Sequence, residues 1–337
     1  MTLVAITSGG PRKHALLSQF QEEGSVWNQA IAKRAFGDSC DCRVPGFRLE
    51  FVEAVNGEAC RTRDRLEALA GDVVEAFGLS ASQRDRMGEL CSKMRPGNRR
   101  VLGCLLANLR AMRCLVAQQR PAMIIEDNVR VARRADCADL CARGIDAFRS
   151  GGVDLLYVGH LGHDDTLALI AAQEGLALPP ETKVQAKGDK PINHELWGTY
   201  AYVASKRLLD AVFAAVRDDF PRRLFFERRR DVDVTPADKL LQRVARDNNF
   251  TIRAMTPPLF FRMPPVIRSK IHTKYDEPFL VSTTLQLKLY NMTWDHVWLT
   301  PDERDKVNHH KSSSESGDDS EKKQKPEEEE DRMQLDP

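Results

Sequence analysis

Long apolar runs, phosphate-binding glycine loops and dense cysteine are all missing from this 337-residue sequence. No stretch of about 18 apolar residues occurs, so no transmembrane segment is expected. Residues 1–7 lack the basic flank of a signal peptide. Neither G-x-x-x-x-G-K-S/T nor G-x-G-x-x-G is present, which argues against P-loop NTPases and classical dinucleotide enzymes. We therefore expect a cytoplasmic protein, with the secretory pathway as the alternative if the chain starts further upstream.

The cysteines and the charges narrow the class of protein further. All eight cysteines lie in the first 141 residues, and Cys104 and Cys114 fall within an apolar helical pattern, which favours reduced thiols over a disulfide scaffold. The chain carries a formal charge of +1, but residues 312–337 hold ten acidic and four basic residues. The remainder is therefore basic enough to attract phosphorylated small molecules, and too diffusely basic to indicate nucleic acid as a partner.

Strand and helix patterns alternate along the chain, which predicts an α/β sheet. Apolar residues with a period near 3.6 predict helices at 13–20, 104–116 and 206–216, and residues 58–95 read as mostly helical. From about residue 309 the composition cannot bury enough apolar surface to form a core, so we expect a disordered acidic tail over 309–337. Short β-branched or apolar runs predict strands at 3–6, 49–55, 122–125, 153–158, 198–204 and 250–255.

Acidic residues directly follow the buried strand predicted at 122–125. Glu126-Asp127-Asn128 would lie at its carboxyl end, where open α/β sheets bind ligands. Carboxylates there are costly unless a cation meets them. A divalent metal that bridges the phosphates of a nucleotide sugar meets that need, because Mg²⁺ and Mn²⁺ prefer oxygen ligands. The alternative is that Glu126 and Asp127 cap a following helix or pair with Arg130 or Arg133.

Five stretches, in order along residues 1–262, carry a family resemblance. They are Leu49-Glu50-Phe51-Val52-Glu53-Ala54-Val55-Asn56-Gly57, Gly103-Cys104-Leu105-Leu106-Ala107-Asn108, Met123-Ile124-Ile125-Glu126-Asp127-Asn128-Val129, Trp197-Gly198-Thr199-Tyr200-Ala201-Tyr202-Val203-Ala204-Ser205, and Asp231-Val232-Asp233 with Thr256-Pro257-Pro258-Leu259. The chain thereby resembles glycosyltransferase family 25, which includes bacterial lipooligosaccharide and procollagen galactosyltransferases. At the positions of these five stretches, in the same order, the family has the patterns Phe-x-x-x-x-Ala-Val-Asp-Gly, Gly-Cys-x-x-Ser-His, Leu-Glu-Asp-Asp-Val, Gly-Thr-x-Gly-Tyr-x-x-Ser, and late Pro-x-Asp and x-Pro-Pro-Leu elements.

The resemblance implies a GT-A-like, Rossmann-type fold that binds a nucleotide sugar. The implied activity is metal-assisted, inverting transfer of a hexose, galactose or glucose, from a UDP-sugar to a hydroxyl on a glycan, protein or lipid-linked acceptor. The implied cofactor is Mn²⁺ or Mg²⁺. The corresponding division of the chain is a glycosyltransferase-like domain at 1–268, an extension packed on it at 269–308, and the tail.

Carried over position by position, the resemblance assigns the candidate site. Its metal and diphosphate motif falls on Glu126, Asp127 and Asn128. The wall of its sugar site falls on Gly198, Thr199 and Tyr200.

Two further assignments follow from the resemblance. Inversion by direct displacement needs a carboxylate to take the acceptor's proton. Asp233, at the late acidic position, is the candidate base, with Glu195 and Asp165 as alternatives. Arg12 is a candidate diphosphate contact.

Departures from the family pattern put activity in question. The family's Ser-His is Ala107-Asn108 here, its second Asp is Asn128, and the Gly of its Gly-Tyr is Ala201. A neutral amide holds a hard cation less tightly than a carboxylate does. A relative that binds a ligand or partner without catalysis is therefore the second hypothesis, and a regulatory protein acting through its tail is the third.

Overall fold

The structure, a computed structural model, describes residues 2–21, 48–118, 122–133, 143–144, 146–148, 150–173, 175–178, 185–187, 190–192, 196–228, 231–262 and 276–305. Its compact units are Met1–Trp298 and Leu299–Pro337, and the second is described over residues 299–305. The tail predicted at 309–337 lies outside the described residues. Among the described residues, no helix combines the length and apolar character needed to cross a membrane.

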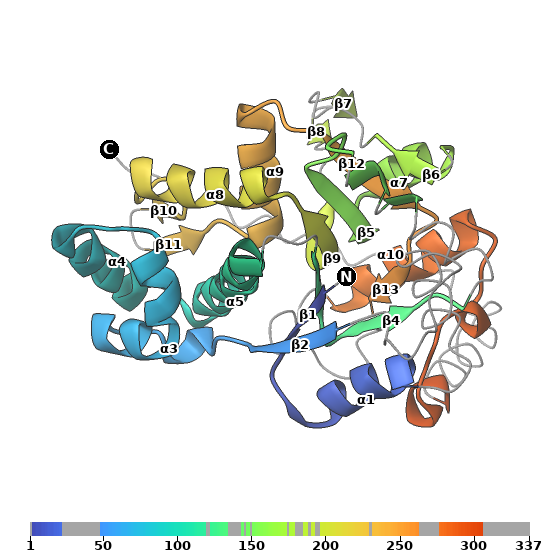
Figure 1. Ribbon diagram of the computed structural model, residues 1–337, viewed down its shortest axis with the longest axis horizontal. Helices are drawn as coiled ribbons and strands as arrows, with labels where there is room; N and C mark the ends of the chain where they lie inside the picture. Colours follow the sequence, from blue (N-terminus) through green and yellow to red (C-terminus); the bar gives the residue numbers. More distant parts are fainter. Residues whose placement is uncertain are drawn as a thin grey trace, which may run out of the picture. The chain divides into compact units, whose positions relative to one another are not determined.

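A mixed seven-stranded sheet runs through the larger unit in the order β2-β1-β3-β9-β5-β12-β6 (Figure 1). Strand β1 pairs in parallel with β2 and β3, whereas β9 is antiparallel to both of its neighbours, β3 and β5. The predicted α/β fold class is thus confirmed, and each strand predicted from the sequence lies in this sheet. The strands are β1 Thr2–Thr7, β2 Arg48–Glu53, β3 Ala122–Glu126, β5 Leu155–Leu161, β6 Gly175–Ala177, β9 Trp197–Ala204 and β12 Ile252–Thr256.

Helices cover the sheet because successive side chains of its strands point to opposite faces, and both faces are apolar. Val4, Ile6 and Ile124 belong to one core cluster with residues of α3, α4, α5, α8 and α9, while Leu3 and Ile125, also buried, point the other way. Figure 1 shows α1 on the other side of β1 and β2 from α3 and α5. The helices are α1 Gly10–Gln21, α3 Arg63–Ala76, α4 Ala81–Lys93, α5 Pro96–Gln118, α7 Asp164–Ala171, α8 Lys206–Asp218, α9 Ala237–Asp247 and α10 Asp276–Leu289.

Short strand pairs complete the described part of the unit. β4 (Val129–Val131) pairs with β13 (Phe260–Arg262), β10 (Phe225–Arg228) with β11 (Asp231–Val234), and β7 (Gln185–Lys187) with β8 (Lys190–Ile192), all antiparallel. Two short 3₁₀ helices are η1 (Gly57–Ala59) and η2 (Trp294–His296). Helix α10, from the predicted extension, donates from Gln286 Nε2 to the carbonyl of His160 in β5, at 2.8 Å. The predicted domain boundary at residue 268 stays a prediction.

Two of the quoted motifs pack directly on each other. A Cβ added to Gly57 of η1 would lie 1.8 Å from the Arg99 carbonyl oxygen, and one added to Gly103 would lie 2.5 Å from the Val55 carbonyl oxygen. Both neighbours are backbone atoms, so a rotamer change cannot relieve either contact. Glycine at both positions therefore lets the end of β2 and helix α5 approach closely.

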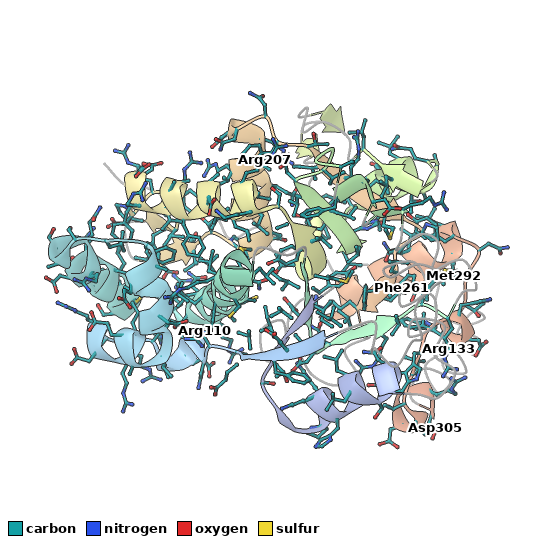
Figure 2. All side chains as sticks on the ribbon, viewed as in Figure 1. Arg110, Arg133, Arg207, Phe261, Met292 and Asp305 are labelled. Carbon is teal, nitrogen blue, oxygen red and sulfur yellow. The ribbon has the colours of Figure 1, made fainter. Side chains whose placement is uncertain are left out.

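A buried carboxylate ties β5, α8 and the start of β12 together. Asp154 is 0% exposed and accepts hydrogen bonds from Arg207 Nη2 at 2.6 Å, Ser205 Oγ at 2.9 Å and the Thr251 amide at 3.0 Å. Figure 2 labels Arg207, on α8. Burial alone would raise the pKa of Asp154, but these hydrogen bonds, with that from Arg207 first, bring it below the ordinary aspartate value.

Asp154→Asn is expected to lower the free energy of unfolding by about 2 kcal/mol at pH 7, because an amide cannot accept from all three donors. A lowered folded-state pKa stabilises the fold above the unfolded pKa of about 4, and that contribution is lost as the pH falls through the folded value. Wild type should therefore lose more stability than the variant between pH 6 and pH 3 in urea unfolding. Asp210→Asn, which breaks an exposed α8 pair with Lys206, should follow wild type; equal acid sensitivity in Asp154→Asn would contradict the prediction.

Candidate functional site

The candidate site lies where the direction of chain winding changes. From β1 the chain passes through α1 to β2 on one side, and it returns through α3, α4 and α5 to β3 on the other side of β1. In open α/β sheets the ligand crevice lies beyond the carboxyl ends of the strands at such a switch point. The residues at those two ends are Thr7–Gly9 and Glu126–Asn128.

Asp127 is held by the turn that follows β1. Its Oδ2 accepts from Thr7 Oγ1 and from the Ser8 amide, both at 3.0 Å, and its own amide donates to the Ile6 carbonyl at 3.0 Å. Its Oδ1 lies 3.7 Å from Arg12 Nη1 of α1. Two segments about 120 residues apart, both singled out from the sequence, thus meet at one carboxylate.

Two glycines with positive φ shape this turn: Gly9 has φ +82° and Gly10 has φ +63°. Such angles are ordinary for glycine and uncommon for other residues. They let the chain turn from β1 straight into α1, which begins at Gly10. Capping of a following helix by Glu126 and Asp127, one of the alternatives raised from the sequence, is wrong, because strand β4 follows the Glu126–Asn128 turn.

Glu126 points to the other face, toward α5, as the alternation after Ile124 and Ile125 requires. Its Oε1 lies 3.9 Å from the Cys104 Sγ, and its Oε2 accepts from Asn128 Nδ2 at 3.3 Å. Burial raises the pKa of Glu126, and the charge of Arg262 opposes this rise. Glu126 is thus a half-buried acid whose charge is partly compensated by a cation.

The start of β9 borders the same region. Gly198 has φ +90°, and its amide donates to Asp238 Oδ2 at 2.8 Å. A Cβ on Gly198 would lie 2.6 Å from the ring of Tyr200. Tyr200 is 2% exposed, its hydroxyl has no hydrogen-bond partner among the described residues, and burial raises its pKa well above the ordinary value. The charges of Glu126 and Arg262 both act on it, so the structure brings Tyr200 and Glu126 into one neighbourhood, with Gly198 and the buried Thr199 in the same strand.

Asp233 lies elsewhere. Its Oδ1 accepts from Asn98 Nδ2 at 2.9 Å, in the first turn of α5. Cys104, which touches Glu126, comes six residues later, which is about 9 Å along the helix axis. Of the alternatives, Asp165 is exposed in the first turn of α7, and Glu195 lies outside the described residues. The assignment of the base to Asp233 stays a prediction.

Sequence reasoning missed two residues of this region. Asp238, in the first turn of α9, acts electrostatically on both Glu126 and Cys104 in addition to holding Gly198. Its sequence signal was present, because Pro236-Ala237-Asp238 has the Pro-x-Asp spacing itself. Arg262 had no such signal: it reaches the site because β13 pairs with β4, which places it opposite Val129.

Three of the departures from the family pattern, Ala107, Asn108 and Ala201, are core positions. Asn108 is 1% exposed, accepts from the Tyr202 hydroxyl at 3.1 Å and donates to the Cys104 carbonyl at 3.1 Å. Ala107 is buried as well. Asn108 therefore joins α5 to β9, and the departure that bears directly on the candidate site is Asn128.

The side-chain oxygens of the Glu126–Asn128 turn suit a hard cation, but they form a smaller ligand set than the family motif does. Within the described part of the chain, no group of three or more His, Cys, Asp or Glu side chains is arranged to hold a metal ion. Hard cations also take amide and water oxygens. Asn128 Oδ1 is buried without a hydrogen-bond partner among the described residues, and it follows Asp127 directly. Asp127 and Asn128 thus carry side-chain oxygens of the kind that hard cations take, each on a different side of the turn.

Comparison with known proteins leaves the resemblance untested. No protein-family model and no curated protein matches this chain. The relationship to glycosyltransferase family 25 therefore remains a hypothesis that rests on the residues quoted above.

Proposed function

We propose that this chain is a glycosyltransferase that moves a hexose, galactose or glucose, from a UDP-sugar to a hydroxyl acceptor on a glycan, protein or lipid-linked saccharide. The observation that carries the proposal is the meeting of Asp127, Arg12 and the β1–α1 turn at the switch point of the sheet. A helix N-terminus with a basic residue favours a phosphate group. The proposal includes a GT-A-like fold, and the mixed seven-stranded sheet is compatible with such a fold.

A divalent cation, Mn²⁺ or Mg²⁺, would be held by Asp127 and Asn128, and Glu126 supports Asn128 through its hydrogen bond. When bound, the cation supplies neutralisation of the charge that develops on the leaving diphosphate. Gly198, Thr199 and Tyr200 border the hexose in this arrangement. Asp238 of α9 accepts a hydrogen bond from the Gly198 amide, so α9 fixes the position of this wall of the proposed sugar site.

The proton of the acceptor hydroxyl must pass to a carboxylate for an inverting displacement. Asp238 is the better placed candidate, since it touches Gly198 and acts on Glu126, whereas Asp233 contacts the start of α5. Asp238 therefore takes the role of general base in the proposed reaction.

Binding without turnover is the second candidate function, and one observation favours it. Asn128 brings no charge to the cation, so the site holds one carboxylate fewer than the family motif does. A cation bound weakly enough would leave a nucleotide-binding protein with little transferase activity.

Release of UDP separates the two functions. With a panel of UDP-sugars and Mn²⁺, wild type is expected to release UDP, and Asn128→Asp to reach half-maximal release at an Mn²⁺ concentration lower by on the order of tenfold. Asn248→Asp, at the exposed end of α9, adds the same charge away from the site and should behave as wild type.

Calorimetric titration with UDP completes the test. UDP binding without release in either protein would identify a binding protein. Absence of both binding and release would show that the proposed function is wrong.

A further inference from the structure

Trp197, the first residue of β9, keeps part of its side chain exposed at the edge of the sheet where the candidate site lies. Strand β9 runs antiparallel to β3 and to β5, so its first residues lie at the edge where those two strands end. Trp197 pairs there with Leu161, the last residue of β5, and Gly198 of the proposed sugar-site wall follows it directly. Trp197 therefore borders the region proposed to hold the hexose.

Helix α9 fixes the backbone on both sides of Trp197. Asp238 Oδ2 accepts from the Gly198 amide at 2.8 Å, and Gln242 Nε2 donates to the Leu196 carbonyl at 2.8 Å. These two helix residues are four positions apart and so lie on one face of α9, and Gln242 is 2% exposed. The peptide units before and after Trp197 are thus held by one helix, which leaves little backbone freedom to lose when a ligand binds there.

The ring of His163 packs against the indole of Trp197. Their ring centroids lie 4.4 Å apart and the ring planes are inclined by 72°, which is an edge-to-face arrangement. His163 is the N-cap residue of α7, two positions after the end of β5, and β5 lies on the opposite side of β9 from β3 and β1. The aromatic pair therefore extends from β9 toward β5, away from Asp127 and the β1–α1 turn, where the diphosphate is proposed to bind.

A half-exposed, rigidly held indole is complementary to a sugar ring. A pyranose presents a flat face of C–H groups that packs on an aromatic ring, while its hydroxyls point outward to polar groups. Small-molecule sites accordingly combine aromatic surface with a few fixed polar groups. Asp238, the proposed base, accepts from the residue after Trp197, and the acceptor hydroxyl has to reach this carboxylate. An extended peptide or an alkyl chain has no comparable flat face, so the aromatic pair favours a saccharide as the acceptor.

We propose that Trp197 is a stacking platform for a sugar ring of the acceptor, which makes the acceptor a saccharide. The inference rests on the proposed function and names the substrate class that the site takes. His163 is a positioning residue, because its ring holds the indole in orientation. Since the diphosphate binds across β9, affinity for UDP does not depend on Trp197.

Saturation-transfer NMR tests this inference with methyl β-galactoside, methyl β-glucoside, N-acetylglucosamine and lactose, each titrated into the full-length chain with UDP and Mn²⁺. At least one of these sugars is expected to bind wild type, with the strongest transfer to C–H protons of one ring face. Trp197→Leu keeps an apolar side chain without the ring and should weaken that binding by about tenfold or more, whereas Trp197→Phe should stay within about threefold of wild type. The dissociation constant of UDP should change by less than about twofold in both variants.

Phe226→Ala is the matched control, because it removes an aromatic ring that is 45% exposed on β10, outside the seven-stranded sheet. It should bind the sugar as wild type does. A second measurement needs only wild type and Trp197→Phe, and so does not depend on the folding of Trp197→Leu. The sugar should change the tryptophan fluorescence of wild type and leave that of Trp197→Phe unchanged, because the responding indole is gone.

Three results would overturn the inference. They are absence of sugar binding by wild type, equal sugar binding by wild type and Trp197→Leu, and a tenfold loss of UDP affinity in Trp197→Leu, which would assign the indole to the nucleotide. UDP binding and release by wild type would leave the proposed function standing in each case. Absence of both UDP binding and UDP release in wild type would contradict the proposed function itself.

Discussion

Gly57→Ala is expected to lower the free energy of unfolding by about 3 kcal/mol or more, and to prevent folding if the wild-type margin is small. The added Cβ would lie 1.8 Å from the Arg99 carbonyl oxygen and 2.7 Å from the Gly103 amide nitrogen. Both are backbone atoms inside or against α5, so the helix itself would have to move. Urea unfolding followed by tryptophan fluorescence measures the loss.

Gly97→Ala is the control, because Gly97 lies in α5, the helix against which Gly57 packs, and a Cβ added to Gly97 meets nothing within 4 Å. That variant should be unchanged or more stable by up to about 1 kcal/mol, since alanine loses less backbone entropy in a helix. If Gly57→Ala unfolds at the same urea concentration as wild type, the close approach of η1 to α5 is not present in the protein.

Asp238→Asn is expected to lower kcat for UDP-dependent transfer by roughly 10²–10⁴-fold, the usual contribution of a general base. Affinity for UDP should change little, because Asp238 holds the sugar end of the site through Gly198. The carboxylate also accepts from the Lys239 amide, so the variant is expected to lose about 1 kcal/mol of stability. Rates are therefore compared well below its unfolding temperature.

Asp233→Asn is the decisive comparison, because it changes the residue favoured by the sequence. Its kcat should stay within about twofold of wild type, since Asp233 accepts from Asn98 Nδ2 of α5 at 2.9 Å and pairs through its strand with Phe226 of β10. A large loss in Asp233→Asn together with a normal rate in Asp238→Asn would restore the assignment made from the sequence.

Much of the fold follows from local patterns in the sequence. The apolar run at 122–125 ends in acids, and it forms β3 with Glu126 as its last residue. Ser205 precedes the helix predicted at 206–216, and its hydroxyl accepts from the Leu208 amide at the start of α8. Such features depend on the spacing of neighbouring residues, so a single sequence can reveal them.

Strand order and register could not be predicted in the same way. Nothing in the sequence shows that β9 inserts antiparallel between β3 and β5, because pairing depends on contacts between distant segments. Arg262 enters the candidate site only through the register of β13 with β4. The choice of Asp233 as the base had the same cause, since Asp238, five positions further on, lies beyond the change from β11 to α9.

The reversed direction of β9 has a consequence for how substrate preference can change. Where strands are parallel, their last residues border the ligand crevice. In β9 the first residues border the candidate site instead, because Gly198 lies at its beginning. The other end of β9 leads directly into α8, which packs in the core. Insertions or deletions before Trp197 are therefore expected to reshape the candidate site while the helix after Ala204 keeps its place, which makes this position suitable for exchanging loops between related chains.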